Sequence, residues 1–180
     1  MTSKTYNIFK RKLFTTFLLI FVLFLVVKAL FVNQNLYINT TKSLPLGVYK
    51  LVTEISAFKK GDIILFCLDE NVASDVSKSD ILSFGNCPFD LSPIGKTIYA
   101  SFDDMVKIDD RGIFINGRYI DNTRPYYLPS IKPLMLNTIL KDDEYIVISQ
   151  KDNSFDSRYF GIVKRKDIKG KLISKMIIPQ

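Results

Sequence analysis

The chain has 180 residues, enough for one well-packed domain. Its formal charge of +7 is concentrated at the N-terminus. The first 32 residues hold five basic and no acidic side chains, which leaves 20 basic and 18 acidic residues, or +2, downstream. This placement indicates membrane topology and argues against a nucleic-acid partner. The sequence has no histidine, which excludes Ser-His-Asp catalysis, Cys-His catalysis and histidine-ligated zinc, and we expect neither a metal nor a cofactor.

Residues 13–32 form a long apolar run, with 17 apolar side chains in 20 positions. A helix of that length spans about 30 Å, the thickness of the hydrocarbon core of a bilayer. A buried core helix would have a weaker apolar run. A cleaved signal peptide would have a shorter run followed by small residues, whereas this run continues through Lys28 and Leu30 to Phe31. We therefore predict an uncleaved transmembrane signal anchor over 13–32.

The flanks of the run predict its orientation, because basic residues stay on the cytoplasmic side. The basic residues that precede it are Lys4, Lys10, Arg11 and Lys12. Residues 1–12 are then a cytoplasmic N-terminus, and residues 33–180 form one exported domain. The expected location is the bacterial inner membrane, crossed once, with the domain on the periplasmic or outer face.

Beyond a polar connector over 33–43, short β-branched and aromatic runs separated by turn residues predict a mainly β domain. The predicted strands are 48–55, 62–66, 95–100, 105–108, 112–115, 118–120, 145–149 and 172–178. Asn116-Gly117 favours the positive φ values of a type I′ hairpin turn between two of them.

Residues 68–91 are polar and rich in turn residues, without a clear period, and predict a surface excursion. Cys67 and Cys87 lie at its two ends. An oxidising compartment would permit a disulfide between them, which would close a long loop, whereas two buried free thiols are the alternative.

In a chain without histidine, a serine nucleophile needs another base. A lysine can serve if burial lowers its pKa from about 10.4 to about 8, a shift that costs the fold about 3 kcal/mol. Such a lysine needs apolar surroundings. Lys96 has Ile94, Ile98 and Tyr99 nearby, whereas the lysines at 59–60 and 164–171 look solvated.

Four segments together carry more information than any one of them. Taken alone, Ser43-Leu44-Pro45-Leu46-Gly47 reads as an ordinary turn. In chain order the segments are NTTKSLPLGVY at 39–49, KGDIILF at 60–66, KTIYASFDD at 96–104 and DNSFDSRYFG at 152–161. Their order and spacing resemble the signal peptidase I superfamily. The N-x-T-x-S-x-P-x-G-x-Y pattern, with Phe66-Cys67 and Asn86-Cys87-Pro88, is similar to the TraF-type conjugative transfer peptidases.

This resemblance implies a coiled β-sheet catalytic domain behind one N-terminal transmembrane helix, and it implies roles for particular residues. Ser43 would be the nucleophile and Lys96 the general base, with the lysine amine about 3 Å from the serine hydroxyl. Thr41 would stabilise the oxyanion together with the Ser43 backbone N–H, and Ser154 would orient the amine. For Thr41 and Ser154, a turn-capping hydroxyl is the alternative.

Asp156 and Arg158 match a structural ion pair near the site, which supports the site without taking part in the chemistry. The resemblance implies that the chain removes leader or tail segments from exported precursors, with small residues such as alanine before the cut. In the TraF-type group the expected substrate is a conjugative pilin precursor, and the expected partners are components of a type IV secretion apparatus.

Two other functions remain open. A general signal peptidase I is one, although those enzymes usually carry methionine where this chain has Leu44. A catalytically silent, membrane-tethered assembly module is the other. It is motivated by the segment after Lys96, where Thr97, Ile98, Phe102 and Asp103 replace the K-R-V and P-G-D elements of the family.

Overall fold

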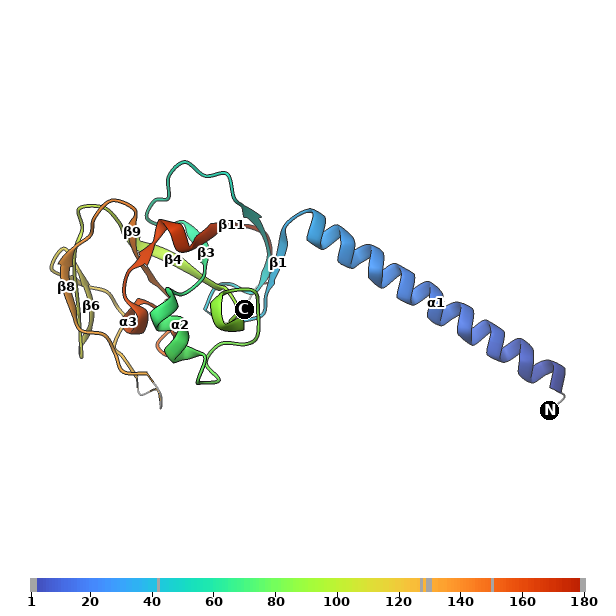
Figure 1. Cartoon of the computed structure of the whole chain (residues 1–180). Helices are drawn as coiled ribbons and strands as arrows, with labels where there is room; N and C mark the ends of the chain where they lie inside the picture. Colours follow the sequence, from blue (N-terminus) through green and yellow to red (C-terminus); the bar gives the residue numbers. More distant parts are fainter. Residues whose placement is uncertain (1–2, 42, 127, 129–130, 150, 179–180) are drawn as a thin grey trace. The chain divides into compact units, whose positions relative to one another are not determined.

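The computed structural model describes residues 3–41, 43–126, 128, 131–149 and 151–178, and it divides into two compact units, Met1–Tyr37 and Ile38–Gln180 (Figure 1). The first unit contains helix α1, Ser3–Asn33. Its stretch Lys10–Leu30 has a mean hydropathy of 2.6 over a membrane-spanning window, so by length and composition it fits a membrane span or a signal anchor.

The sequence of α1 explains its continuity. No glycine or proline occurs before Pro45, so nothing in the apolar run breaks the helix. Thr15 and Thr16 both donate their hydroxyl protons to the carbonyl of Lys12, at 2.8 and 3.0 Å. These bonds satisfy the polar groups of the threonines inside the helix itself, which suits an apolar environment. The predicted apolar helix is therefore present.

The second unit is mainly β, as predicted, and its described strand pairs are antiparallel. One sheet has seven strands in the order β1-β2-β11-β3-β4-β9-β10, and the other has four in the order β7-β6-β5-β8. The first sheet comprises β1 (Leu36–Asn39), β2 (Gly47–Val52), β11 (Ile168–Ile177), β3 (Ile63–Phe66), β4 (Ile94–Ala100), β9 (Glu144–Ile148) and β10 (Val163–Lys164). The second comprises β7 (Arg118–Tyr119), β6 (Gly112–Ile115), β5 (Met105–Asp109) and β8 (Leu136–Ile139).

The apolar interior has two clusters, and β4 and β9 contribute to both of them. In the first cluster, Ile94 and Ile98 of β4 pack with residues of the helices α2 (Glu70–Val76) and α3 (Ser157–Phe160). In the second cluster, Ala100 and the end of β9 pack against β5 and β6 of the smaller sheet. These two strands therefore connect the two clusters.

All eight predicted strands overlap observed strands, but their ends differ. β2 ends at Val52 instead of residue 55, and β11 begins at Ile168, four residues before the predicted start. The strands β1, β8 and β10 were not predicted, because they are short and lack both the continuous apolar run of the equally short β3 and the Asn116-Gly117 turn that marks β6 and β7. The predicted hairpin turn is confirmed: Asn116 and Gly117 have φ values of 52° and 78°, as a type I′ turn requires.

The prediction that residues 68–91 form only a surface excursion is wrong. Helix α2 lies within this segment, and its Ala73 and Val76 are buried in the first core cluster together with Leu68 and Leu91. Seven residues are less than two helical turns, which is too short for a helical period to be recognised in the sequence.

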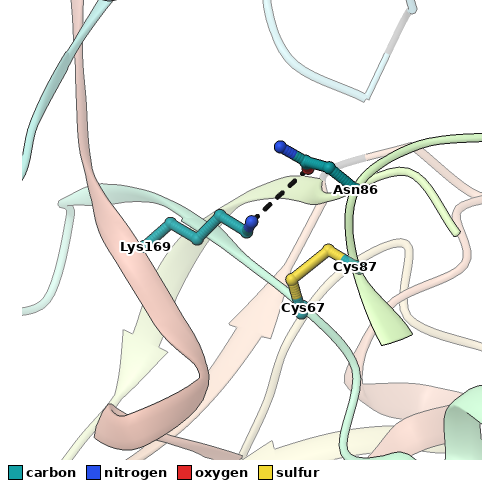
Figure 2. The surroundings of a disulfide bond; sticks show 4 residues. All are labelled: Cys67, Asn86, Cys87 and Lys169. Atoms are coloured by element: carbon teal, nitrogen blue, oxygen red, sulfur yellow. Dashed lines mark hydrogen bonds between the residues drawn. A yellow bond between two sulfur atoms is a disulfide. The ribbon is translucent and has the colours of Figure 1, made fainter. Parts of the chain in front are cut away.

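Cys67 and Cys87 form a disulfide, so the free-thiol alternative is excluded (Figure 2). Their Cα atoms are 5.5 Å apart, and 20 positions separate them in the sequence. Next to the bond, the amine of Lys169 lies 3.4 Å from the side-chain oxygen of Asn86. The disulfide ties the segment that contains α2 to the end of β3.

Removal of the disulfide should destabilise the domain. A disulfide that closes a loop of about 20 residues raises the free energy of unfolding by about 3 kcal/mol, because it restricts the unfolded chain. We expect the double variant Cys67→Ser and Cys87→Ser to lose that amount in urea unfolding of the full chain in detergent. A reductant should lower the wild-type midpoint to that of the double variant and leave the variant itself unchanged. Equal midpoints for the oxidised wild type and the double variant would contradict the expectation.

Candidate active site

The side chain of Asn39, at the end of β1, organises the segment around Ser43. Its amide nitrogen donates to three backbone carbonyls, those of Thr41 at 2.8 Å, Leu44 at 3.0 Å and Pro45 at 3.1 Å. Its oxygen accepts the backbone N–H of Thr41 at 3.2 Å and the Thr41 hydroxyl at 2.8 Å. One carboxamide therefore holds Thr41 beside Leu44 and Pro45, on the two sides of Ser43.

The later residues of the same motif fix the loop to the sheet. The Tyr49 hydroxyl donates to the Pro45 carbonyl at 2.7 Å, and the tyrosine ring is buried in β2. A Cβ atom on Gly47 would collide with the carbonyl oxygen of Met176 on the paired strand β11. Only glycine permits this close approach. The contacts of Asn39, Thr41, Pro45 and Tyr49 and the close backbone approach at Gly47 thus explain the spacing N-x-T-x-S-x-P-x-G-x-Y.

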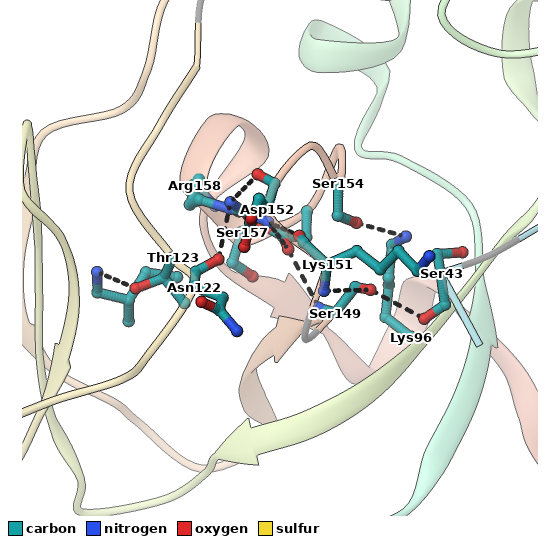
Figure 3. A network of polar contacts seen from close by, with 12 residues as sticks. Ser43, Lys96, Asn122, Thr123, Ser149, Lys151, Asp152, Ser154, Ser157 and Arg158 are labelled. Atoms are coloured by element: carbon teal, nitrogen blue, oxygen red, sulfur yellow. Dashed lines mark hydrogen bonds and ion pairs between the residues drawn. The ribbon is translucent and has the colours of Figure 1, made fainter. Parts of the chain in front are cut away.

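Ser43 has two polar contacts, one from its side chain and one from its backbone. Its Oγ lies 3.1 Å from Thr41 Oγ1. The Thr41 hydroxyl has one proton and already donates it to Asn39, so the Ser43 hydroxyl is the donor in this pair. The carbonyl of Ser43 accepts a hydrogen bond of 2.9 Å from the Ser149 hydroxyl, visible in Figure 3.

Packing of Leu44 brings this segment to β4. Leu44 is buried, and a Cβ atom on Gly95 would approach its Cδ1 to 3.0 Å, so the side chain covers the space that Gly95 leaves open. Gly95 is the residue directly before Lys96. The residue after Ser43 therefore contacts the residue before Lys96, and the two segments are held side by side.

Lys96 lies on the buried face of β4, where side chains alternate between the interior and the other face. It is 4% exposed, and its neighbours on that face are Ile94 and Ile98. Its amine donates to Ser154 Oγ at 2.9 Å (Figure 3). Tyr99, which is close in the sequence, packs instead against the second core cluster.

These surroundings lower the pKa of the Lys96 amine from 10.5 to about 8. Burial is the largest cause, because the apolar interior disfavours the ammonium form. The charge of Asp156 opposes the shift, and the charge of Arg158 adds to it. With a pKa of about 8, roughly a tenth of the amine is neutral at pH 7, and the neutral amine is the form that accepts a proton.

The expected direct hydrogen bond between Lys96 and Ser43 is not among the contacts of the described residues. The Lys96 amine is bonded to Ser154, and the Ser43 hydroxyl is paired with Thr41. Catalytic hydrogen bonds are often long in the absence of substrate and shorten when it binds. Of the residues predicted from the sequence, Ser43 is thus paired with Thr41, and Lys96 with Ser154.

Asp156 and Arg158 form a fully buried, bidentate ion pair with two contacts of 2.8 Å. The guanidinium also donates to the backbone carbonyls of Asn122, Arg124, Lys151 and Asp152. Asp156 caps α3 by accepting the N–H of Arg158 at 3.2 Å, and it accepts the N–H of Ser149 at 3.1 Å. These bonds compensate for the desolvation of both charges, and they tie Ser149, Lys151 and Asp152 to α3.

The sequence analysis did not assign Asn39 and Ser149 to the site. Asn39 belonged to the recognised motif, and its regular spacing to Thr41 and Ser43 was the available signal. Ser149 was predicted only as the last residue of a strand, and β9 ends one residue before it. Nothing local marks Ser149, because its contact to Ser43 spans 106 positions. Among the described residues, no group of three or more His, Cys, Asp or Glu side chains could hold a metal ion.

Comparison with known proteins adds independent information to this geometry. The family model described as signal peptidase, peptidase S26, matches residues 10–177. The chain belongs to the peptidase S26 family. Two proteins from Escherichia coli, both named plasmid transfer protein TraF, are similar to this S26 chain. One is 33% identical over 138 residues and the other 31% over 139, and each match covers 73% of this chain and 77% of the relative.

A crystal structure of a signal peptidase I from Enterococcus faecalis V583 is also similar to the S26 chain, with 20% identity and a TM-score of 0.40. The match covers 67% of this chain and all of the other. The family resemblance recognised in the sequence is confirmed by the family model and by the TraF relatives.

The lowered pKa of Lys96 has a consequence for stability. Below about pH 8 the folded state buries a charged amine, whereas the unfolded chain keeps its amine charged up to about pH 10.5. Folding therefore releases a proton between these values, and the Lys96 contribution to the free energy of unfolding rises with pH by about 3 kcal/mol across this window.

We expect the variant Lys96→Met to lack this rise, because it has no proton to release. Urea midpoints of the full chain in detergent, measured from pH 7 to pH 10, test the difference between variant and wild type. Lys78→Met is the matched control, since the Lys78 side chain is 72% exposed and should leave the wild-type slope unchanged. The same slope in Lys96→Met and wild type would contradict a buried amine.

Proposed function

We propose that this chain is a membrane-bound serine endopeptidase that removes leader or tail segments from exported precursors with a Ser43/Lys96 dyad. The observation that carries the proposal is the buried Lys96 amine, hydrogen-bonded to Ser154 and next to the Ser43 segment, in an S26 chain that has no histidine. A neutral lysine amine is the group in these surroundings that can take a proton from a serine hydroxyl.

In the proposed reaction, Ser43 Oγ attacks the scissile carbonyl carbon, and its proton passes to the neutral Lys96 amine. The tetrahedral oxyanion is stabilised by the Ser43 N–H and by the Thr41 hydroxyl. Collapse breaks the C–N bond, and the leaving amine takes the proton from the Lys96 ammonium. A water molecule then attacks the acyl ester as Lys96 again accepts the proton, and Ser43 regains its hydrogen.

The contacts of Thr41 and Ser154 suit these roles but require one rearrangement. Ser154 Oγ accepts a hydrogen bond from the Lys96 amine and so restricts the rotation of the Lys96 side chain. The Thr41 hydroxyl now donates to Asn39, and to stabilise an oxyanion it must turn its single proton toward the substrate. The Ser43 hydroxyl would at the same time leave Thr41 and turn toward Lys96.

We further propose that the substrate is a conjugative pilin precursor and that the chain acts beside a type IV secretion apparatus. The two TraF relatives, which are named as plasmid transfer proteins, support this choice. Leu44 in place of methionine favours it over a general signal peptidase I. The separate hydrogen-bond partners of Ser43 and Lys96 favour a silent assembly module instead, and the variants below decide between these functions.

Precursor cleavage should depend on both members of the dyad. In membranes that carry the chain and the pilin precursor of a conjugative plasmid, we expect no cleavage by Ser43→Ala, Lys96→Ala or Lys96→Arg, because arginine keeps its proton. Thr41→Ala should lower the rate about 100-fold and leave residual activity from the remaining N–H donor. Lys78→Ala, at the exposed lysine, is the control and should cleave normally. Full cleavage by Lys96→Ala would identify another base, and normal processing by Ser43→Ala would sink the proposal.

The proposed topology has its own test. We propose that residues 1–12 are cytoplasmic, that α1 crosses the inner membrane, and that residues 33–180 lie on the outer side, because the basic residues precede the apolar run. Protease added to intact spheroplasts should digest the domain and leave a cytoplasmic marker protein intact. Protection of the domain until the membrane is lysed would show the opposite orientation.

A further inference from the structure

We propose that Ser149 is a positioning residue for the nucleophile, whose hydroxyl fixes the Ser43 peptide and connects it to the buried Asp156–Arg158 ion pair. This inference rests on the proposed function. According to this inference, the Asp156–Arg158 ion pair stabilises α3 and also helps to position Ser43, through Ser149.

The location of Ser149 is set by strand pairing. Thr97 of β4 is paired with Ile148, the last residue of β9, so Ser149 directly follows the residue that is paired with the neighbour of Lys96. Ser149 is 3% exposed, which excludes water from its hydrogen bonds. It therefore stands beside the proposed base, directly where β9 ends.

The direction of the bond between Ser149 and Ser43 is unambiguous. A carbonyl oxygen can only accept, so the Ser149 hydroxyl must donate to Ser43 over the 2.9 Å that separate them. The same hydroxyl oxygen accepts the backbone N–H of Lys151 at 3.3 Å. The Ser149 hydroxyl donates its proton to Ser43 and accepts a hydrogen bond from the Lys151 N–H, so its orientation is fixed.

The backbone of Ser149 is fixed by the ion pair. Asp156 Oδ2 accepts the Ser149 N–H at 3.1 Å and the Arg158 guanidinium at 2.8 Å. Arg158 also holds the carbonyls of Lys151 and Asp152, on the same turn, at 3.0 and 2.7 Å. The turn that carries Ser149 is thus anchored at three points inside the protein.

The bond from Ser149 matters because the hydrogen bonds of Asn39 do not include the Ser43 carbonyl. Asn39 binds the carbonyls of Thr41, Leu44 and Pro45, whereas the Ser43 carbonyl is held by Ser149. Because the Ser43 Cα atom is bonded to the carbonyl carbon, to Cβ and to the backbone nitrogen, a loop movement that takes this carbonyl away from Ser149 would also displace Oγ and the N–H of Ser43. A displacement of about 1 Å at a reacting atom is enough to lower a rate about 100-fold.

The test uses the full chain in detergent and, as probe, a peptide p-nitrophenyl ester that ends in alanine, with release of p-nitrophenolate as the signal. We expect Ser149→Ala to lower kcat about 10- to 100-fold, with KM within about threefold of the wild type. The pH midpoint of kcat should stay near the wild-type value, because the Lys96 amine is bonded to Ser154 and not to Ser149. Ser149→Thr keeps the hydroxyl and should retain kcat within about threefold.

Ser157→Ala is the matched control. Ser157 is also fully buried and its hydroxyl also binds the backbone of this region, accepting the N–H of Val147 in β9 at 2.9 Å. Its hydroxyl has no contact to Ser43 among the described residues. We expect Ser157→Ala to lower the unfolding midpoint and to leave kcat unchanged.

Several outcomes would overturn the inference. For Ser149→Ala, these are an unchanged kcat or a shifted pH midpoint of kcat. A loss of kcat in Ser157→Ala or in Ser149→Thr as large as the loss in Ser149→Ala would also contradict it. Ser43→Ala is measured in parallel. If it still turns over the ester, the proposed function and this inference fail together. If it is inactive and Ser149→Ala equals the wild type, only this inference fails.

Discussion

The burial of one lysine amine is the constraint on which the rest of the site depends. Lys96 occupies an interior position of β4 between Ile94 and Ile98, where an ordinary strand would carry another apolar residue. The depressed pKa of the amine corresponds to about 3 kcal/mol of folding free energy lost near neutral pH. The domain tolerates this cost because β4 lies within the larger sheet and contributes to both core clusters. A solvated lysine would remain charged and could not act as a base.

The second constraint is the position of the Ser43 segment beside β4, which hydrogen bonds to backbone carbonyls and one packing contact fix. Asn39 folds the loop before β2, and Leu44 seats the loop on β4 where Gly95 has no side chain. Such contacts involve main-chain carbonyls and the absence of a side chain, so they specify a few residue types at fixed spacing. This is why the motif around Ser43 is recognisable in a single sequence.

The Asp156–Arg158 ion pair affects this site mainly through geometry. The ion pair of Asp156 and Arg158 is fully buried and satisfied by backbone carbonyls, and it lies close enough to Lys96 to influence its pKa in both directions. Because the two charges oppose each other, their net effect on the amine is small beside that of burial. Their larger effect is geometric, since they hold the turn that presents Ser149 and Ser154 between β9 and α3.

The sequence by itself determined the features that depend on neighbouring residues: the apolar helix, the mainly β domain, the turn at Asn116, the exclusion of histidine chemistry and an apolar strand around Lys96. Helix α2 and the strands β1, β8 and β10 were not predicted, because each is short and has no apolar run or turn signal that marks it. The Lys96–Ser154 bond joins residues 58 positions apart, and it was implied by the family resemblance, not by the residues around either partner. The Ser149–Ser43 bond joins residues 106 positions apart, and only the tertiary structure shows it. No local pattern encodes such pairings. They arise only when strand register and core packing bring distant segments to one place.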